Sequence, residues 1–223
     1  MRPLALAFAL ALTAAGCGAF GSKAAERDIS EADQRWAYAA SLQVSDFPAG
    51  WVESSPETDE APPDECPSVD LSDLTVTGEG ERAFDNEEAA PFVLVARAVL
   101  ASAEDARESV ARGSGAELEE CIRESFEAEA EREETEDFRV ENVQAAEAAA
   151  IAVGELSRAF RLAFDYVLAG DERVGATLDI LTFQRGRATV TLGFLGVAEP
   201  FPPGPAERLA RAADARVERN PPP

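Results

Sequence analysis

The side chains with the most distinctive chemistry in this 223-residue chain are three cysteines, Cys17, Cys66 and Cys121. The chain contains no histidine, which excludes Ser-His-Asp and Cys-His catalysis, histidine-ligated zinc and a histidine pH switch. Its one lysine, Lys23, lies close to the start, so a Ser-Lys dyad is also excluded. Carboxylates are plentiful, but no pair of them has a distinctive setting. We therefore expect no catalytic residue, no metal site and no cofactor.

The first cysteine follows a segment with the features of an export signal. Arg2 supplies a positive charge, Leu4 to Ala15 form an apolar run too short to span a bilayer, and small residues follow. Ala14-Ala15-Gly16-Cys17 resembles the lipobox of bacterial lipoproteins, with Ala14 where leucine is more usual. In such proteins the cysteine is diacylated, as by palmitate, and becomes the first residue. The alternative is an ordinary signal peptide with a chance cysteine nearby.

The charge of the chain limits its partners. The formal net charge is −23, so nucleic acid and anionic lipid surfaces should repel it. Stable attachment to a membrane would therefore depend on a lipid anchor at Cys17. The densest acidic run, Glu117 to Asp137, could be a cation surface, but it lacks the spacing of a calcium loop. It is better explained as a solvated helix face.

The other two cysteines form an even pair in an exported chain, for which one disulfide is the simplest interpretation. Free thiols or a metal pair without histidine are the alternatives. Leu118, Cys121 and Ile122 recur at helical spacing, so Cys121 should face inward from a helix toward the loop that contains Cys66. Such a bridge would stabilise the fold by about 4 kcal/mol.

The best-defined elements are three consecutive strands near the C-terminus, over 156–168, 173–183 and 188–197. Apolar residues alternate along the first, with Leu156, Phe160, Leu162, Phe164, Tyr166 and Leu168 on one face. Short turns at 169–172 and 184–187 join the strands, which predicts an antiparallel meander. The aromatic stripe could pack into a core or could line a ligand cavity.

Further elements complete an α+β pattern. We expect helices over 26–42, 102–112, 116–130 and 205–217, strands over 82–85, 92–100 and 138–143, and a helix or loop over 145–153. Ser30 and Ser102 stand at N-cap positions. We predict a single domain in which helices cover one face of an antiparallel sheet. The chain divides into a signal peptide (1–16), a flexible tether (17–28), the domain (29–219) and a disordered tail (220–223).

One short segment resembles a known family. The segment Asp46-Phe47-Pro48-Ala49-Gly50-Trp51, after a lipobox and before a cysteine, is similar to the PknH-like extracellular sensor domains of actinobacteria and their allied lipoproteins. The order of the later elements fits as well, including an alanine-rich helix with a second cysteine and a closing run of strands. The resemblance implies an α+β fold and a sensing or binding role without catalysis.

These observations predict a lipoprotein on the outer face of the cell membrane with a non-catalytic, sensor-like binding domain. Its partners would be the membrane, through the lipid, and a small apolar ligand or a cell-surface protein. The sequence identifies no ligand-binding residue. The alternative function is a carrier of lipid or another apolar molecule, in which the aromatic stripe would line a hollow interior.

Overall fold

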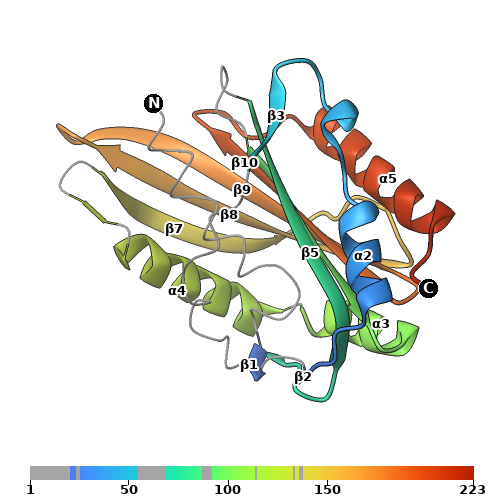
Figure 1. Ribbon diagram of the computed structural model, residues 1–223. Helices are drawn as coiled ribbons and strands as arrows, with labels where there is room; N and C mark the ends of the chain where they lie inside the picture. The colour runs from blue at the N-terminus through green and yellow to red at the C-terminus, as the bar shows by residue number, and fades with distance from the viewer. Residues whose placement is uncertain are drawn as a thin grey trace.

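The computed structural model describes residues 21–23, 26–54, 69–86, 92–113, 115–132, 134–135 and 138–223. Its main feature is an eight-stranded sheet crossed by helices (Figure 1). The strand order is β2-β5-β6-β10-β9-β8-β7, and β3 also pairs with β5. All these pairs are antiparallel except β2 with β5. A separate small sheet joins β1 to β4 in parallel.

The elements have the following bounds along the chain. The strands are β1 Gly21–Lys23, β2 Glu26–Arg27, β3 Trp51–Ser54, β4 Val69–Asp70, β5 Thr75–Asn86, β6 Phe92–Leu100, β7 Phe138–Ala148, β8 Leu156–Leu168, β9 Glu172–Arg185 and β10 Ala188–Val197. The helices are α2 Glu31–Ala39, α3 Ala103–Arg112, α4 Ala116–Arg132 and α5 Pro203–Arg219, with a 3-10 turn at Val44–Asp46. This arrangement confirms the predicted α+β class.

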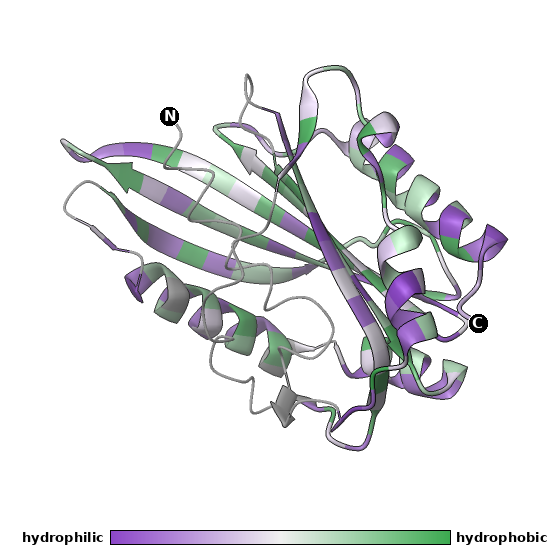
Figure 2. Cartoon of the chain, in the orientation of Figure 1, coloured by the Kyte–Doolittle hydropathy of each residue, from purple (hydrophilic) through white to green (hydrophobic). Residues whose placement is uncertain are grey.

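The meander formed by β8, β9 and β10 agrees with the prediction almost residue for residue. Its turns use backbone conformations with positive φ at Gly170, Asp171 and Gly186, which glycine and aspartate adopt more readily than most residues. The outer strands β7 and β8 carry the alternation of hydrophilic and hydrophobic residues that identifies a half-exposed strand (Figure 2).

The prediction that helices cover only one face of the sheet is wrong. Every residue of β6 is buried, and so is every residue of β10 except Val197. A strand that is apolar on both sides needs cover on both sides. The continuous run Phe92-Val-Leu-Val-Ala at the start of β6 carries this signal in the sequence.

Two apolar clusters therefore form, one on each face. The α4-face cluster joins α3 and α4 to the sheet; it includes Leu94, Leu118, Cys121, Ile122, Phe126, Phe160, Phe164, Tyr166 and Leu178. The α5-face cluster joins α5 and the Phe47–Trp51 segment to the other face; it includes Phe47, Trp51, Val95, Phe183, Leu192, Phe194, Phe201, Leu209 and Val217. Together the two clusters fix the helices on opposite sides of the central strands.

Helix α2 lies directly on β5 because glycine leaves room for it. A Cβ atom on Gly78 would come within 2.5 Å of the Asp33 backbone, and one on Gly80 within 3.2 Å of the Ala37 backbone. The helix expected over 26–42 is shorter, at Glu31–Ala39, because residues 26–27 form β2. Ser30 is its N-cap as predicted, and its Oγ accepts a hydrogen bond from the Asp33 N–H at 3.1 Å. Ser102 caps α3 in the same way through the Asp105 N–H at 3.0 Å.

Both ends of the domain differ from the expected tether and tail. Residues 21–23 and 26–27 form β1 and β2, so part of the expected tether adds strands to the sheets. At the other end, Trp36 Nε1 donates to the Asn220 carbonyl at 2.6 Å, and Arg187 Nη1 donates to the Pro223 carbonyl at 2.6 Å. Arg187 also pairs with the buried Asp33 at 2.8 Å. These polar contacts hold the last residues against α2 and the sheet.

Two strands are longer than predicted. β5 begins at Thr75 rather than at residue 82, and β7 continues to Ala148 through part of the segment expected to be a helix or loop. Glycines in β5 and alanines in β7 are weak strand formers in isolation. Pairing of β5 with β6 and of β7 with β8 overrides this preference.

The side chain of Glu81 on β5 differs from most carboxylates of this acidic protein because it is partly buried. Its Oε1 atom is buried and has no hydrogen-bond partner within the described residues. Burial alone raises the pKa of Glu81 from 4.5 to about 7. Between these two values the folded state binds more protons than the unfolded chain, so Glu81 lowers stability as the pH rises through that window.

Replacing Glu81 with glutamine should remove this pH dependence. We expect Glu81→Gln to raise the free energy of unfolding by about 1–2 kcal/mol at pH 8.5 and to change it little at pH 4.5, where wild-type Glu81 is already protonated. Urea unfolding at both pH values measures the difference. Glu53→Gln, at a more exposed carboxylate of the neighbouring strand β3, is the control. An equal effect of Glu81→Gln at both pH values would contradict the prediction.

Candidate functional site

Two of the three cysteines lie outside the described part of the chain. Cys17 and Cys66 fall outside it, so lipidation and the Cys66–Cys121 bridge stay predictions. Cys121 is on α4 and faces the sheet, buried beside Leu118, Ile122 and Phe126 as its helical spacing predicted. It is not a free thiol.

The aromatic stripe of β8 packs against other rings. Phe164 lies 4.9 Å from Phe126 of α4 and 5.2 Å from Tyr166 between ring centroids, and Tyr166 lies 5.3 Å from Phe138 of β7. Such spacings are those of aromatic side chains in a filled core. The stripe therefore belongs to the α4-face cluster, which favours the core interpretation over a ligand-lined cavity.

The Asp46–Trp51 segment is also structural in this fold. Phe47 stacks on Trp51 with ring centroids 4.9 Å apart and contacts Phe84 at 4.5 Å. Asp46 pairs with Arg216 of α5 at 2.6 Å. The segment thus closes one side of the α5-face cluster and connects it to α5.

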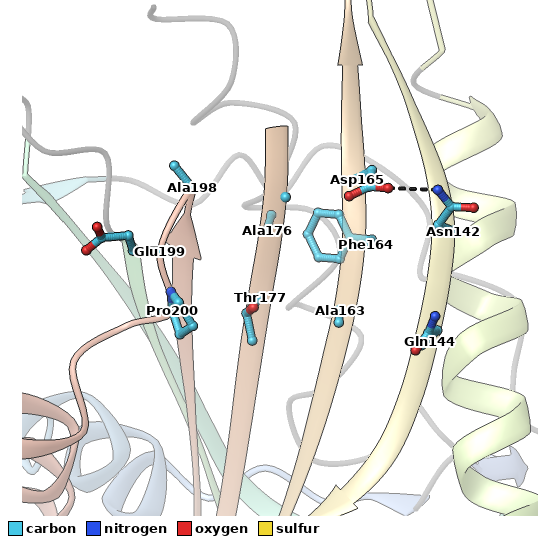
Figure 3. A pocket seen from close by; sticks show the side chains of 11 residues that line it. Asn142, Gln144, Ala163, Phe164, Asp165, Ala176, Thr177, Ala198, Glu199 and Pro200 are labelled. Atoms are coloured by element: carbon cyan, nitrogen blue, oxygen red, sulfur yellow. Dashed lines mark hydrogen bonds between the residues drawn. The ribbon is translucent and has the colours of Figure 1, made fainter. Parts of the chain in front are cut away.

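A surface pocket of about 320 Å³ lies over strands β7, β8 and β9 (Figure 3). Its floor consists of small side chains on adjacent strands, among them Ala163 of β8 and Thr177 of β9, which pair directly. Gly175 adds further room beside Asp165. The space exists because a row of small residues meets an uncovered part of the sheet.

One wall of the pocket is a β-bulge in β7. Asn142 and Val143 lie between the paired positions Glu141 and Gln144, opposite the single residue Phe164 of β8. Asn142 has a φ of 58°, a conformation that asparagine tolerates better than most residues. The bulge directs the Asn142 side chain to Asp165, and Nδ2 donates to Oδ2 at 2.7 Å (Figure 3).

A cluster of ion pairs fixes the bulge. Glu141 accepts hydrogen bonds from Arg139 at 2.7 Å and from Arg173 at 2.6 Å, and Arg139 reaches Asp171 at 3.0 Å. The hydrogen bonds from Arg139 and then Arg173 lower the pKa of Glu141 below its usual range. Glu141 is therefore ionised over a wide pH range.

The opposite wall is the segment Ala198–Pro200 that follows β10. Ala198 has a φ of 65°, and its N–H donates to the Gly175 carbonyl at 2.8 Å. The segment then folds back over Gly196, where a Cβ atom would lie 2.3 Å from the Glu199 carbonyl oxygen. This return places Phe201 in the α5-face cluster, 5.1 Å from Phe194, and leaves Glu199 and Pro200 at the pocket rim.

The polar groups of the lining are mainly hydrogen-bond acceptors. Asp165 and Glu199 supply carboxylates, Thr177 a hydroxyl, and Gln144 and Asn142 amides. The lining contains no lysine or arginine. Its carboxylates and other acceptors are suited to binding a molecule with donor groups or a positive charge.

Sequence reasoning missed this pocket. Its lining residues are ordinary types, and they come together only through a bulge and a reversed loop. The Gly-Val-Ala-Glu-Pro run at 196–200 marks the end of a strand but not the direction of the loop. Asn142 in the middle of an alternating segment was the one available sign of a bulge.

Among the described residues, no group of three or more cysteine, aspartate or glutamate side chains is placed to hold a metal ion. No helix in the described part of the chain is long and apolar enough to cross a membrane.

No protein-family model matches the chain, and no curated protein matches it. Among solved structures, the chain is similar to the crystal structure of the extracellular domain of PknH from Mycobacterium tuberculosis, with 10% sequence identity and a TM-score of 0.45. The match covers 84% of this chain and 97% of that one. A likeness at this level does not establish membership of that family.

A methyl group on Gly196 should disrupt the loop wall. We expect Gly196→Ala to push Glu199 and Phe201 away from the sheet and to lower the free energy of unfolding by about 2–4 kcal/mol. Urea unfolding measures the loss. Gly175→Ala is the matched control, since its added Cβ would lie 3.8 Å from the nearest atom. Equal effects of the two variants would contradict the assigned role of Gly196.

Proposed function

We propose that this protein is a lipid-anchored lipoprotein of the outer face of the cell membrane whose α+β domain binds a ligand without catalysing a reaction. Export and anchoring are inferred from the sequence alone, from the charged and apolar start and from the Ala-Ala-Gly-Cys motif that ends at Cys17. Because the remaining chain is strongly acidic, the lipid must supply the membrane affinity.

The pocket over β7, β8 and β9 is the observation that carries the binding role. Its two walls each contain a non-glycine residue with positive φ, Asn142 and Ala198. Such conformations cost free energy, and they concentrate at binding sites where the surrounding structure maintains them. Three such residues occur among the described residues, and two of them line this one pocket.

The lining indicates the class of ligand. Acceptors surround the floor and basic groups are absent from it, so anionic ligands would be repelled. A small molecule with an ammonium group or several hydroxyl groups would complement Asp165, Glu199 and Thr177. This differs from the apolar ligand expected from the sequence, because the aromatic stripe that suggested one is packed against α4.

Lipidation can be tested by metabolic labelling. In a bacterial host that acylates lipoproteins, we expect the full chain to incorporate labelled palmitate and Cys17→Ala to lose the label completely. Cys66→Ala is the matched control and should keep it. Label that persists in Cys17→Ala would contradict the anchor at this position.

Binding in the pocket can be tested with a library of small amines and polyols. We expect at least one compound to raise the melting temperature of the full chain by about 5 °C at 100-fold excess over its Kd. Ala163→Trp should abolish the shift by filling the floor. Ala146→Trp, on an exposed residue outside the pocket, should preserve it. A shift that survives Ala163→Trp, or no shift with any compound, would contradict binding in this pocket.

A further inference from the structure

Arg97 on the central strand β6 is the most buried charged side chain among the described residues, with 2% of its surface exposed. It pairs with Gly80 of β5 on one side and with Val190 of β10 on the other. Helix α2 passes over Gly80 at close range. The guanidinium is therefore enclosed between the sheet and the helix layer of the α5 face.

Only part of this guanidinium has a partner. Nη1 donates to the Ala37 carbonyl at 3.3 Å, near the C-terminal end of α2, where carbonyls lack partners within the helix. Nε and Nη2 are buried and have no acceptor within the described part of the chain. The hydroxyl of Ser41, just beyond the same helix end, is also buried without a partner there.

The two free donors lie on the same edge of the guanidinium. This edge, with parallel Nε–H and Nη2–H groups, binds carboxylate or phosphate oxygens in pairs. Two other arginines of this chain use it in that way. Arg161 binds both oxygens of Asp179 at 2.6 and 2.8 Å, and Arg185 binds both oxygens of Asp214 at 2.5 and 2.9 Å. At Arg97 the same edge has no hydrogen-bond acceptor among the described residues.

The surroundings of Arg97 are also positively charged. Arg82 of β5 is its diagonal neighbour on the same face, and it contacts the half-exposed Glu53 at 3.4 Å. Arg216 of α5 is paired with Asp46 at 2.6 Å. Burial, followed by the like charges of Arg82 and Arg216, lowers the pKa of Arg97 to about 9, so it is still charged near neutral pH. Arg82 and Arg216 thus each have a carboxylate partner, whereas Arg97 has none among the described residues, in a chain with a formal charge of −23.

We propose that Arg97 anchors a buried binding site for a small oxyanion, a carboxylate or a phosphate, between α2 and the sheet. The open edge of Arg97 would bind two oxygens of the anion, and the Ser41 hydroxyl would add a third donor. A buried water could accept one of these hydrogen bonds, but it would leave the charge uncompensated. The site is separate from the pocket over β7–β9, whose lining is acidic.

The test uses the full chain and three probes, sodium acetate, sodium phosphate and sodium chloride, at constant ionic strength. We expect acetate or phosphate to raise the melting temperature saturably, by about 5 °C at 100-fold excess over Kd, and chloride to have no such effect. The anion that gives the larger shift in melting temperature shows whether the site prefers a carboxylate or a phosphate. Arg97→Met should remove the shift, and Arg161→Met, at an exposed edge already occupied by Asp179, should retain it.

A spectroscopic measurement covers the case in which Arg97→Met does not fold. In a spectrum of arginine Nε–H groups, the Arg97 signal of the wild type should move on titration with the effective anion. The Arg161 and Arg185 signals should not move, because their edges are occupied. An Arg97→Lys variant should lose the preference over chloride, since lysine keeps the charge without the paired donors. An unmoved Arg97 signal with both acetate and phosphate would overturn the proposal and leave only water at the site.

Discussion

The burial of β6 and β10 on both faces is the constraint on which the rest of the structure depends. Strands that are apolar on both sides must lie in the middle of the sheet and need helices above and below. Helices α3 and α4 cover one side, α2 and α5 the other, and the longer, half-polar strands β7 and β8 extend beyond α5. The pocket lies on this extension, so its position is a consequence of how far the cover reaches.

The distribution of charge follows the same arrangement. Most arginines lie at the surface and are neutralised by neighbouring carboxylates, as in the Arg139–Glu141–Arg173 group and in Arg123 with Glu120. Exposed pairs of this kind contribute little to stability, but they fix local geometry such as the bulge at Asn142. Arg97 differs because it lies in the interior, where a charge without a counter-charge is costly. The proposed oxyanion would remove this cost. Burial raises the pKa of Glu81 to about 7, so below that pH this carboxyl group is mostly protonated and uncharged.

Much of the fold could be predicted because its signals are local. Period-two alternation located the meander, and serine caps at Ser30 and Ser102 located two helix starts. The helices on both faces of the sheet and the length of β7 could not be predicted from alternation. Both depend on which strands lie at the centre of the sheet. The pocket was missed for a similar reason: Asn142, Ala163 and Ala198 come from different elements, and their meeting depends on a bulge and on the return of the chain over Gly196.

Hydrogen exchange of the backbone amides, followed by mass spectrometry or NMR, tests the central constraint most directly. If burial on both faces of β6 and β10 holds the domain together, amides of 92–100 and 188–197 will exchange only through global unfolding. Amides of the edge strand β7, over 138–148, will exchange faster through local opening. Exchange of β6 amides as rapid as that of β7 amides would contradict the account, because the sheet would then lack the doubly covered centre from which the pocket and the helix layers are positioned.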